Sequence, residues 1–300
     1  MDKLVTILGP TAVGKTKLAA QLAEKFNGEI ISADSRQVYK GMDLGTGKDY
    51  DDYTVNGNCI PYYLIDIISP QQEFNLFEFA KNFLDAYQVI TNNSRLPFLA
   101  GGTGLYLSAV IQNYQLRQTD FNSIKRQAYD NLSIDELRTL YLKYDANPHV
   151  KRDLDDRERL IKGILIGEED SSKVFTLPVF NNLVIGVRGE RTIIRQKIET
   201  RLRTRLANGM IDEVKSLMDN GVSESRLIAF GLEYKFITLY LTGKINYNDM
   251  FQQLNSSIAA FAKRQMTWYR KMEREGVSIN WLDGPDLSKA SNLVEDFLND

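Results

Sequence analysis

Short, mostly apolar runs alternate with segments of helical periodicity over the first hundred residues. Several of these runs end at a glycine or an aspartate, a pattern typical of buried strands. The apolar runs cover Leu4–Leu8, Glu29–Ser32, Tyr62–Asp66 and Leu96–Ala100, and the helical segments cover Lys17–Phe26 and Leu76–Ile90. Strands that alternate with helices in this way predict an α/β fold built on a parallel sheet.

The pattern changes after the first hundred residues or so. Residues 115–173 are polar and charged, have helical periodicity and no convincing strand, and contain a capping-box sequence at Ser133–Glu136. Strand character returns at Leu183–Val187 and Ser278–Leu282, and long helices are predicted over Thr192–Asn208 and Tyr247–Glu275. We therefore expect residues 1–114 and 178–300 to form one core, with 115–177 as a small all-helical insertion domain.

The composition is that of a folded protein. Of the 300 residues, 43% are hydrophobic and 25% are charged, whereas disorder requires few apolar residues and a large net charge. No stretch approaches the roughly 20 apolar residues that span a bilayer, so we expect no membrane contact. The sequence leads directly into a strand, which predicts a cytoplasmic protein without a signal peptide. One cysteine, Cys59, excludes an internal disulfide, and one histidine, His149, argues against a Cys/His zinc site.

Charge is nearly balanced over the chain but uneven along it. The 37 basic and 39 acidic side chains give a net charge of −2, which does not by itself indicate a nucleic-acid-binding protein. Two segments nevertheless concentrate basic residues, and such local clusters determine the field that a polyanion meets. The first contains Arg188, Arg191, Arg195, Lys197, Arg201, Arg203 and Arg205, and the second contains Lys263, Arg264, Arg270, Lys271 and Arg274. They are either solvated helix faces or surfaces for a polyanion.

A glycine-rich motif follows the first strand and opens the first helix. It fits G-x-x-x-x-G-K-[ST], the phosphate-binding P-loop, and consists of Gly9, Pro10, Thr11, Ala12, Val13, Gly14, Lys15 and Thr16. Its glycines let backbone N–H groups converge on phosphate oxygens at the positive end of a helix dipole. Lys15 adds a positive charge, and the Thr16 hydroxyl is a ligand for Mg²⁺. The motif predicts a P-loop NTPase-like fold and a ligand with a diphosphate or longer, without identifying a reaction.

Two other strand ends carry polar residues. Asp34 follows the second strand, and Gly101–Gly104, which includes Thr103, follows the strand that ends at Ala100. Ligands of such sheets bind at the carboxyl ends of the strands, so we expect both segments near the phosphates. A carboxylate there would ligate Mg²⁺ or accept a proton from a nucleophile. The structural alternatives are a helix N-cap for Asp34 and a tight strand-to-helix turn for the glycines.

Together these residues resemble the tRNA dimethylallyltransferases, also called tRNA isopentenyltransferases. The matching blocks follow the order of that family from end to end of the chain, and ordinary P-loop kinases share only the first. The blocks are Gly9–Thr16, Ile31–Tyr39 continuing into Gly41–Thr46, Leu64–Asp66, Gly101–Tyr106, Gly209–Val214, Ala262–Trp268 and Trp281–Asp283.

The resemblance implies a reaction in which dimethylallyl diphosphate prenylates N6 of the adenosine at position 37, beside the anticodon of tRNA. The P-loop, with Arg201 as a further cation, would bind the diphosphate, and Thr16 would ligate Mg²⁺. Asp34 would accept the N6 proton as a catalytic residue, and Thr103 would orient the amine. The residues assigned to tRNA are Asp34, Ser35, Arg36, Gln37, Arg159, Lys162, Lys263, Arg264, Gln265 and Arg270. We expect a monomer.

The chain departs from the family pattern mainly where tRNA is expected to bind. Tyr62 and Tyr63 replace a histidine pair, Ala259 replaces an arginine, and Gly231–Tyr234 replaces a glycine-tyrosine-basic-glutamate block. The insertion run Lys162–Leu165 also differs from the family's arginine-alanine-leucine-glutamate. These departures leave three alternatives open: an isopentenyltransferase acting on free adenine nucleotides, an RNA-binding protein without activity, and a small-molecule kinase.

Three further residues have ordinary structural explanations. Trp268 and Tyr269 are able to stack on bases, although a core position is the favoured interpretation for Trp268 because Phe261 and Met272 lie along the same predicted helix. Cys59 is interpreted as a small core side chain.

Overall fold

A six-stranded parallel sheet forms the centre of the larger part of the molecule. The computed structural model describes residues 2–122, 124–144, 154–169 and 174–300. The sheet strands, in spatial order, are β10 (Asn280–Asp283), β9 (Asn181–Arg188), β1 (Lys3–Leu8), β6 (Leu96–Gly101), β2 (Gly28–Ala33) and β5 (Tyr62–Tyr63). Every neighbouring pair is parallel. The predicted α/β class is therefore confirmed.

The strand order brings three loops together. β6 lies between β1 and β2, so the chain crosses over β6 on its way from β1 to β2. Gly101 of β6 pairs with Leu8 of β1 on one side and with Ala33 of β2 on the other, so the three strands end at the same level. Because all three strands point the same way, the P-loop, the segment after Ala33 and the segment after Gly101 leave the sheet at one edge.

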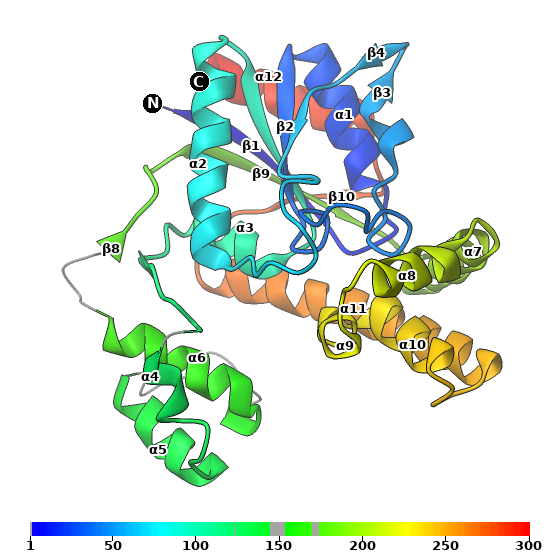
Figure 1. The fold of residues 1–300 in the computed structure, drawn as a ribbon. Helices are drawn as coiled ribbons and strands as arrows, with labels where there is room; N and C mark the ends of the chain where they lie inside the picture. The colour runs from blue at the N-terminus through cyan, green and yellow to red at the C-terminus, as the bar shows by residue number, and fades with distance from the viewer. Residues whose placement is uncertain (1, 123, 145–153, 170–173) are drawn as a thin grey trace. The chain divides into compact units, whose positions relative to one another are not determined.

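Helices cover both faces of this sheet (Figure 1). α1 (Lys15–Lys25) and α12 (Leu287–Asn299) pack together against alternate strand residues such as Val5 and Ile7. α2 (Leu76–Asn92) lies on the other face and contacts α3 (Gly104–Ile111), where the rings of Phe79 and Tyr106 stack with centroids 4.0 Å apart. The sheet is buried on both sides, which explains its continuous apolar strands.

A helical layer continues the same compact unit beyond the sheet. It consists of α7 (Arg191–Ala207), α8 (Met210–Asp219), α9 (Glu224–Phe230), α10 (Leu232–Leu241) and α11 (Tyr247–Arg274). These helices share an apolar cluster, and Val38, Tyr39 and Met42 from the loop after β2 are part of it. The loop that follows Asp34 is therefore anchored in the helical layer. The remaining short elements of this unit are η1 (Tyr50–Tyr53), β3 (Thr54–Val55) and β4 (Asn58–Cys59).

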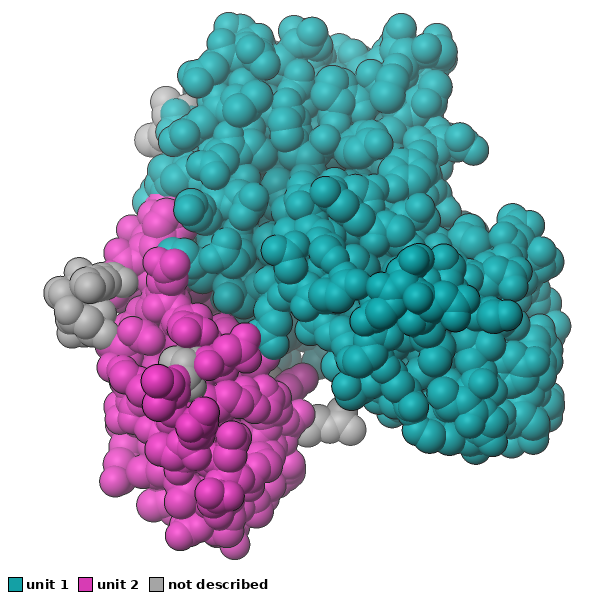
Figure 2. Space-filling view, viewed as in Figure 1, with its two compact units in different colours: residues 1–113, 178–300 teal, residues 114–177 magenta. Residues whose placement is uncertain are grey.

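Residues 114–177 form a second compact unit, separate from residues 1–113 with 178–300 (Figure 2). Its helices are α4 (Ile124–Gln127), α5 (Ile134–Tyr144) and α6 (Arg157–Glu168). Leu137 and Leu160 belong to a small apolar core of its own. The Ser133 hydroxyl accepts from Glu136 N at 3.3 Å and the Glu136 carboxylate accepts from Ser133 N at 2.7 Å, so the predicted capping box is confirmed.

Two details of the predicted elements are wrong. A short strand, β7 (Leu116–Arg117), lies where no strand was expected and pairs with β8 (Val174–Phe175). The strand predicted over Tyr62–Asp66 ends at Tyr63, because Leu64 and Asp66 have positive φ angles of 65° and 56° that break the extended run. His149 lies outside the described residues. No helix among those described is long and apolar enough to span a bilayer.

Candidate functional site

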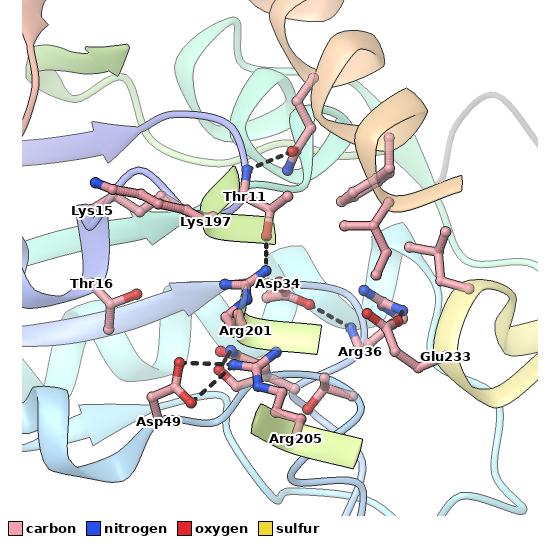
Figure 3. Close-up of a pocket in the computed structure, with 18 of the residues that line it drawn as sticks. Thr11, Lys15, Thr16, Asp34, Arg36, Asp49, Lys197, Arg201, Arg205 and Glu233 are labelled. Atoms are coloured by element: carbon pink, nitrogen blue, oxygen red, sulfur yellow. Dashed lines mark hydrogen bonds and ion pairs between the residues drawn. The ribbon is translucent and has the colours of Figure 1, made fainter. Parts of the chain in front are cut away.

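A cavity of about 300 Å³ lies at the carboxyl edge of the sheet, where the three loops meet (Figure 3). Both basic and acidic side chains line it, together with a small apolar group. The lining comprises Thr11, Ala12, Gly14, Lys15, Thr16, Asp34, Arg36, Gln37, Thr46, Gly47, Asp49, Asp52, Lys197, Arg201, Arg205, Leu232, Glu233, Ile258, Phe261 and Gln265. The cavity is large enough for a small ligand and far too polar for a hydrophobic one.

The P-loop has the backbone shape that phosphate binding requires. Ala12 and Gly14 have positive φ angles of 67° and 88°, and α1 begins at Lys15. Gly9 approaches strand β9 so closely that an added Cβ would lie 2.4 Å from the carbonyl oxygen of Val187. The loop therefore curls tightly between the sheet and the helix N-terminus, where backbone N–H groups face an anion. Of the P-loop residues predicted to bind the diphosphate, the buried Gly9 and Val13 do not line the cavity.

Two positively charged side chains of the cavity, Lys15 and Arg201, repel each other. Burial lowers the pKa of Lys15 to about 8; Asp34 acts against this shift and Arg201 adds to it. Burial, with Arg205 close by, lowers the pKa of Arg201 to about 10, and the Arg201 guanidinium donates to the Thr11 hydroxyl. Cations that destabilise one another in an empty cavity gain from an anionic ligand, so this group of side chains is suited to a diphosphate.

Three cavity cations come from one face of α7. Lys197, Arg201 and Arg205 are spaced four residues apart, the spacing that aligns side chains along a helix. Arg205 is buried and donates to both carboxylate oxygens of Asp49 at 2.9 Å. Of these three cations, the sequence predicts only Arg201 as a ligand-binding residue. The i±4 spacing around Arg201 was the signal that would have identified the other two.

Side chains of α11 link the P-loop to the segment that follows β6. Gln265 is buried; its side-chain oxygen accepts from Thr11 N at 2.9 Å and its amide donates to the Gly102 carbonyl at 2.8 Å. Tyr269 is fully buried and donates to the Gly9 carbonyl at 3.1 Å, so the stacking role considered for Tyr269 is wrong. Trp268 packs against Gly104 and donates to the Ser108 hydroxyl at 2.8 Å, in line with its favoured interpretation as a core residue.

The segment after β2 is held by local hydrogen bonds. One carboxylate oxygen of Asp34 accepts from Arg36 N at 3.0 Å, which fixes the side chain beside its own loop. Ser35 N donates to the Thr103 hydroxyl at 3.0 Å, so Thr103 contacts this segment although it does not line the cavity. The Gln37 amide donates to the Gly47 carbonyl at 3.0 Å and accepts from the Ser32 hydroxyl at 3.1 Å.

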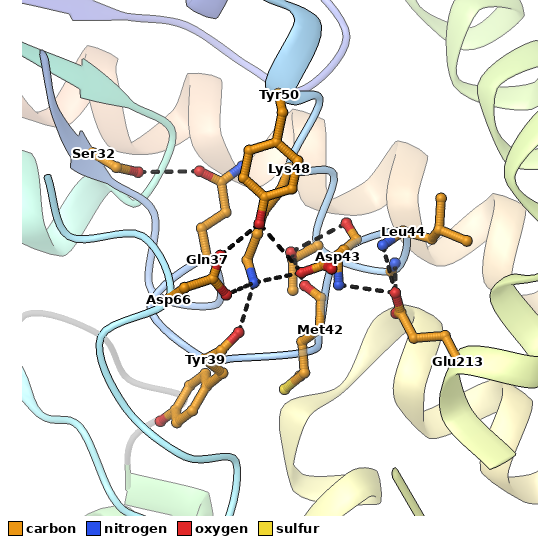
Figure 4. A network of polar contacts seen from close by, with 12 residues as sticks. Ser32, Gln37, Tyr39, Met42, Asp43, Leu44, Lys48, Tyr50, Asp66 and Glu213 are labelled. Carbon is orange, nitrogen blue, oxygen red and sulfur yellow. Dashed lines mark hydrogen bonds and ion pairs between the residues drawn. The ribbon is translucent and has the colours of Figure 1, made fainter. Parts of the chain in front are cut away.

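The far end of the same loop is held by a buried lysine and by a partly buried glutamate (Figure 4). The ammonium group of Lys48, whose side chain is fully buried, donates to Asp43 at 2.8 Å, to the Tyr39 carbonyl at 2.7 Å and to Asp66. The carboxylate of Glu213 on α8 accepts from the backbone N–H groups of Asp43, Leu44 and Gly45 and from the Tyr234 hydroxyl. These long-range contacts fix the wall of the cavity that contains Thr46 and Gly47. Gly41–Thr46 and Gly209–Val214 both belong to the family pattern, but nothing in the sequence predicts that they are in contact.

An ion pair in the cavity wall links the loop after β2 to α10. Arg36, from the loop after β2, donates to Glu233 on α10 at 2.7 Å, and both line the cavity. Although burial opposes it, the charges of Glu233 and Asp34 raise the pKa of Arg36 above its usual value. Glu233 was noted only as a departure from the family pattern.

The cavity offers oxygen donors suited to Mg²⁺. Thr16, Asp34, Asp49 and Asp52 line it, although Asp49 is paired with Arg205. The described part of the chain has no group of three or more acidic, histidine or cysteine side chains arranged for a metal. Mg²⁺ typically takes one or two protein oxygens and completes its shell with water and phosphate oxygens, which this donor set fits.

The remaining residues predicted to bind tRNA lie outside the cavity. Lys263, Arg264 and Arg270 are exposed on α11. Arg159 and Lys162 are on α6, in the second unit, where they pair with Asp156 at 3.7 Å and Glu158 at 3.9 Å. The structure thus groups the predicted diphosphate residues other than Gly9 and Val13 with Asp34, Arg36, Gln37 and Gln265, whereas Ser35 does not line the cavity. Cys59 is exposed, so its interpretation as a core residue is wrong.

Comparison with known proteins identifies the family. The IPP transferase family profile matches residues 37–272, and an isopentenyl transferase profile matches residues 2–63. The chain is 50% identical over 283 residues to tRNA dimethylallyltransferase 2 of Phocaeicola vulgatus, covering 93% of this chain and 92% of the relative. It is 46% identical over 284 residues to tRNA dimethylallyltransferase 1 of Parabacteroides distasonis, covering 94% and 92%.

Solved structures agree with this result. The crystal structure of the full-length tRNA isopentenylpyrophosphate transferase from Bacillus halodurans is similar, with a TM-score of 0.73 and 30% identity over 100% of this chain and 97% of that one. A eukaryotic dimethylallyltransferase that acts on tRNA, at 22% identity and a TM-score of 0.79, shares the fold over 100% of this chain and 80% of that one. The chain described here is a member of the tRNA dimethylallyltransferase, or IPP transferase, family.

Proposed function

We propose that this protein transfers the dimethylallyl group of dimethylallyl diphosphate to the N6 amine of adenosine 37 in tRNA. One observation carries the proposal: Lys15 and Arg201, which suit a diphosphate, share a single cavity with the carboxylate of Asp34. Relatives near 50% identity over more than 90% of this chain are named as tRNA dimethylallyltransferases. The fold and the cavity suit the same chemistry.

The P-loop side of the cavity stabilises the leaving group. As the bond between the allylic carbon and the diphosphate oxygen breaks, negative charge grows on that oxygen. Lys15, Arg201 and the backbone N–H groups of Ala12–Thr16 face this charge and stabilise it without reorganising. Thr16 would hold Mg²⁺, which supplies further charge neutralisation at the diphosphate when it is bound.

The Asp34 side of the cavity receives the acceptor amine. The N6 nitrogen forms the new bond to the allylic carbon, and its proton passes to the free carboxylate oxygen of Asp34. Arg36 N already occupies the other oxygen at 3.0 Å, so the carboxylate is oriented before the substrate arrives. Thr103 fixes Ser35 at 3.0 Å and supports this geometry. Since an exocyclic adenine amine is a poor nucleophile, positioning contributes as much as proton removal.

The tRNA requires a surface as well as a cavity. The target base has to leave its stack to reach Asp34, as with other enzymes that modify bases. The exposed cations Lys263, Arg264 and Arg270 on α11 would contact the phosphates of the anticodon stem-loop, and Arg159 and Lys162 in the helical insertion would add to them. The protein would act as a cytoplasmic monomer.

The test offers one labelled prenyl donor to several acceptors. Dimethylallyl diphosphate is incubated with the protein and Mg²⁺, and with undermodified tRNA, AMP or ATP. We expect label only in tRNA, at an adenosine that becomes N6-prenylated. Asp34→Asn should lower the single-turnover rate by about 10²–10⁴, the usual contribution of a general base, with unchanged affinity for the prenyl donor. Label in AMP or ATP but not in tRNA would favour the free-nucleotide alternative, and no label at all would overturn the proposal.

A further inference from the structure

The Arg36–Glu233 ion pair joins two parts of the cavity wall that are distant in sequence. Arg36 belongs to the loop after β2, two residues beyond Asp34, whereas Glu233 is in the first turn of α10. The side chains are 17% and 6% exposed, and the N–O distance is 2.7 Å. Both line the cavity, and Figure 3 shows them facing each other beside Asp34. The pair is thus sheltered from bulk solvent but open to a ligand.

The backbone before Glu233 is shaped to place that residue. Gly231 has φ 71° and ψ −172°, a conformation that is essentially restricted to glycine. Leu232 follows with φ 41°, in the left-handed region that residues with a Cβ rarely adopt. α10 begins directly at Leu232, and both Leu232 and Glu233 enter the cavity wall. Strained turns of this kind persist where the surroundings require them, often at functional sites.

Glu233 leaves much of the Arg36 guanidinium available. The Arg36 Nη1 atom donates to Glu233, and among the described residues neither Nε nor Nη2 of Arg36 has a hydrogen-bond partner. The guanidinium lies 5.9 Å from the centroid of the Phe261 ring, which also lines the cavity. Its backbone N–H fixes Asp34 at 3.0 Å. A planar group with spare donors, beside an aromatic ring and the proposed base, suits recognition of a nucleotide.

We propose that Glu233 is a positioning residue which holds Arg36 so that its guanidinium donates to the acceptor nucleotide. This inference rests on the proposed function, because it names how the same site recognises its acceptor. The group that Arg36 contacts is a hydrogen-bond acceptor, either on the edge of a base or on a phosphate of the acceptor nucleotide. Glu233 itself contacts neither the prenyl donor nor the reacting atoms.

Steady-state kinetics with Glu233→Gln test the proposal. The amide keeps the shape but no longer fixes the guanidinium by charge. We expect KM for tRNA to rise by about tenfold to a hundredfold, the factor for one hydrogen bond to a charged group, with KM for dimethylallyl diphosphate unchanged. Glu233→Asp keeps the charge and should restore part of the loss. Arg36→Lys should resemble Glu233→Gln, and the double variant should be no worse than either, since both remove one contact.

The salt dependence of tRNA binding distinguishes the two contact types. If Arg36 contacts a phosphate, Arg36→Lys should not change the slope of log affinity against log salt concentration, and Arg36→Gln should reduce the magnitude of that slope by about 1. If Arg36 contacts a base edge, both variants should weaken binding without changing the slope. Either result supports the proposal. Glu295→Gln, which removes the exposed ion pair with Lys25, is the matched control and should change neither KM.

One result would overturn the inference and leave the proposed function intact: a normal KM for tRNA in Glu233→Gln when the wild-type protein prenylates tRNA. If the melting temperature of that variant is also lower, the ion pair has a purely structural role. A wild-type protein without transfer to tRNA would instead contradict the proposed function itself.

Discussion

The two walls of the cavity are built in different ways. The P-loop wall is a continuous strand–turn–helix segment, Gly9–Thr16, whose shape follows from local backbone angles. The wall formed by the loop after β2 has no regular structure over most of Asp34–Asp49 and depends on contacts with residues far along the chain. Thr103, Glu213 and Glu233 each hold a different part of it. The backbone shape of the first wall follows from a local motif, which Gln265 and Tyr269 then tie to α11, whereas the shape of the second wall itself depends on tertiary contacts.

This difference matters for the proposed function, in which the two walls receive different substrates. A diphosphate is the same in every reaction of this chemistry, so a short local motif is sufficient to bind it. The acceptor is a folded RNA whose recognition has to be adjusted, and side-chain contacts from α8 and α10 allow that adjustment without altering the P-loop. We therefore expect mutations in the first wall to abolish turnover and those in the second to shift acceptor affinity.

Lys15→Ala gives the largest expected effect and tests the first wall. Removing this cation should lower the single-turnover rate by about 10²–10³, the cost of one preorganised group facing an oxyanion, while tRNA affinity stays normal. Rapid-quench assays at saturating prenyl donor measure the rate, and filter binding measures tRNA affinity. Lys17→Ala, which removes an exposed lysine two residues away on α1, should behave as the wild type. A near-normal rate for Lys15→Ala would contradict the assignment of this wall to the diphosphate.

Glu213→Gln tests the second wall and should have a smaller effect. Its carboxylate accepts four hydrogen bonds, and an amide nitrogen in the same place faces N–H donors without accepting from them. We expect a loss of about 1–3 kcal/mol in the free energy of unfolding by urea, the cost of unsatisfied buried donors. KM for tRNA should rise and the affinity for the prenyl donor should remain. Weaker binding of the prenyl donor with normal tRNA binding would show that the two walls are not separate.

The same contrast explains what the sequence predicts. The P-loop and strands β1, β2 and β6 have local patterns, apolar runs and glycines, and the structure confirms each of these elements. The contacts of Gln265 and Glu213 join segments more than 160 residues apart, and no local pattern predicts them. The resemblance assigns Gln265 to tRNA, and the structure adds that its amide connects Thr11 and Gly102. The strand predicted over Tyr62–Asp66 ends at Tyr63. The chain turns after Tyr63 and brings Asp66 to Lys48, a tertiary contact that no local pattern predicts.

The pH dependence of prenyl-donor binding gives the finest test of the first wall. Burial lowers the pKa of Lys15 from 10.5 to about 8 in the free protein, so its protonated fraction falls above that pH. The protonated lysine binds the diphosphate, and the bound anion raises the lysine's pKa. The affinity for dimethylallyl diphosphate should therefore be constant from about pH 7, above which the diphosphate is ionised, to about pH 8, and fall by no more than about tenfold per unit above pH 8. Lys15→Arg should extend the constant range toward pH 10, where the pKa of Arg201 lies. Calorimetry in two buffers near pH 8.5 should detect proton uptake on binding, and an affinity independent of pH up to 9.5 would show that Lys15 does not carry the charge that the diphosphate meets.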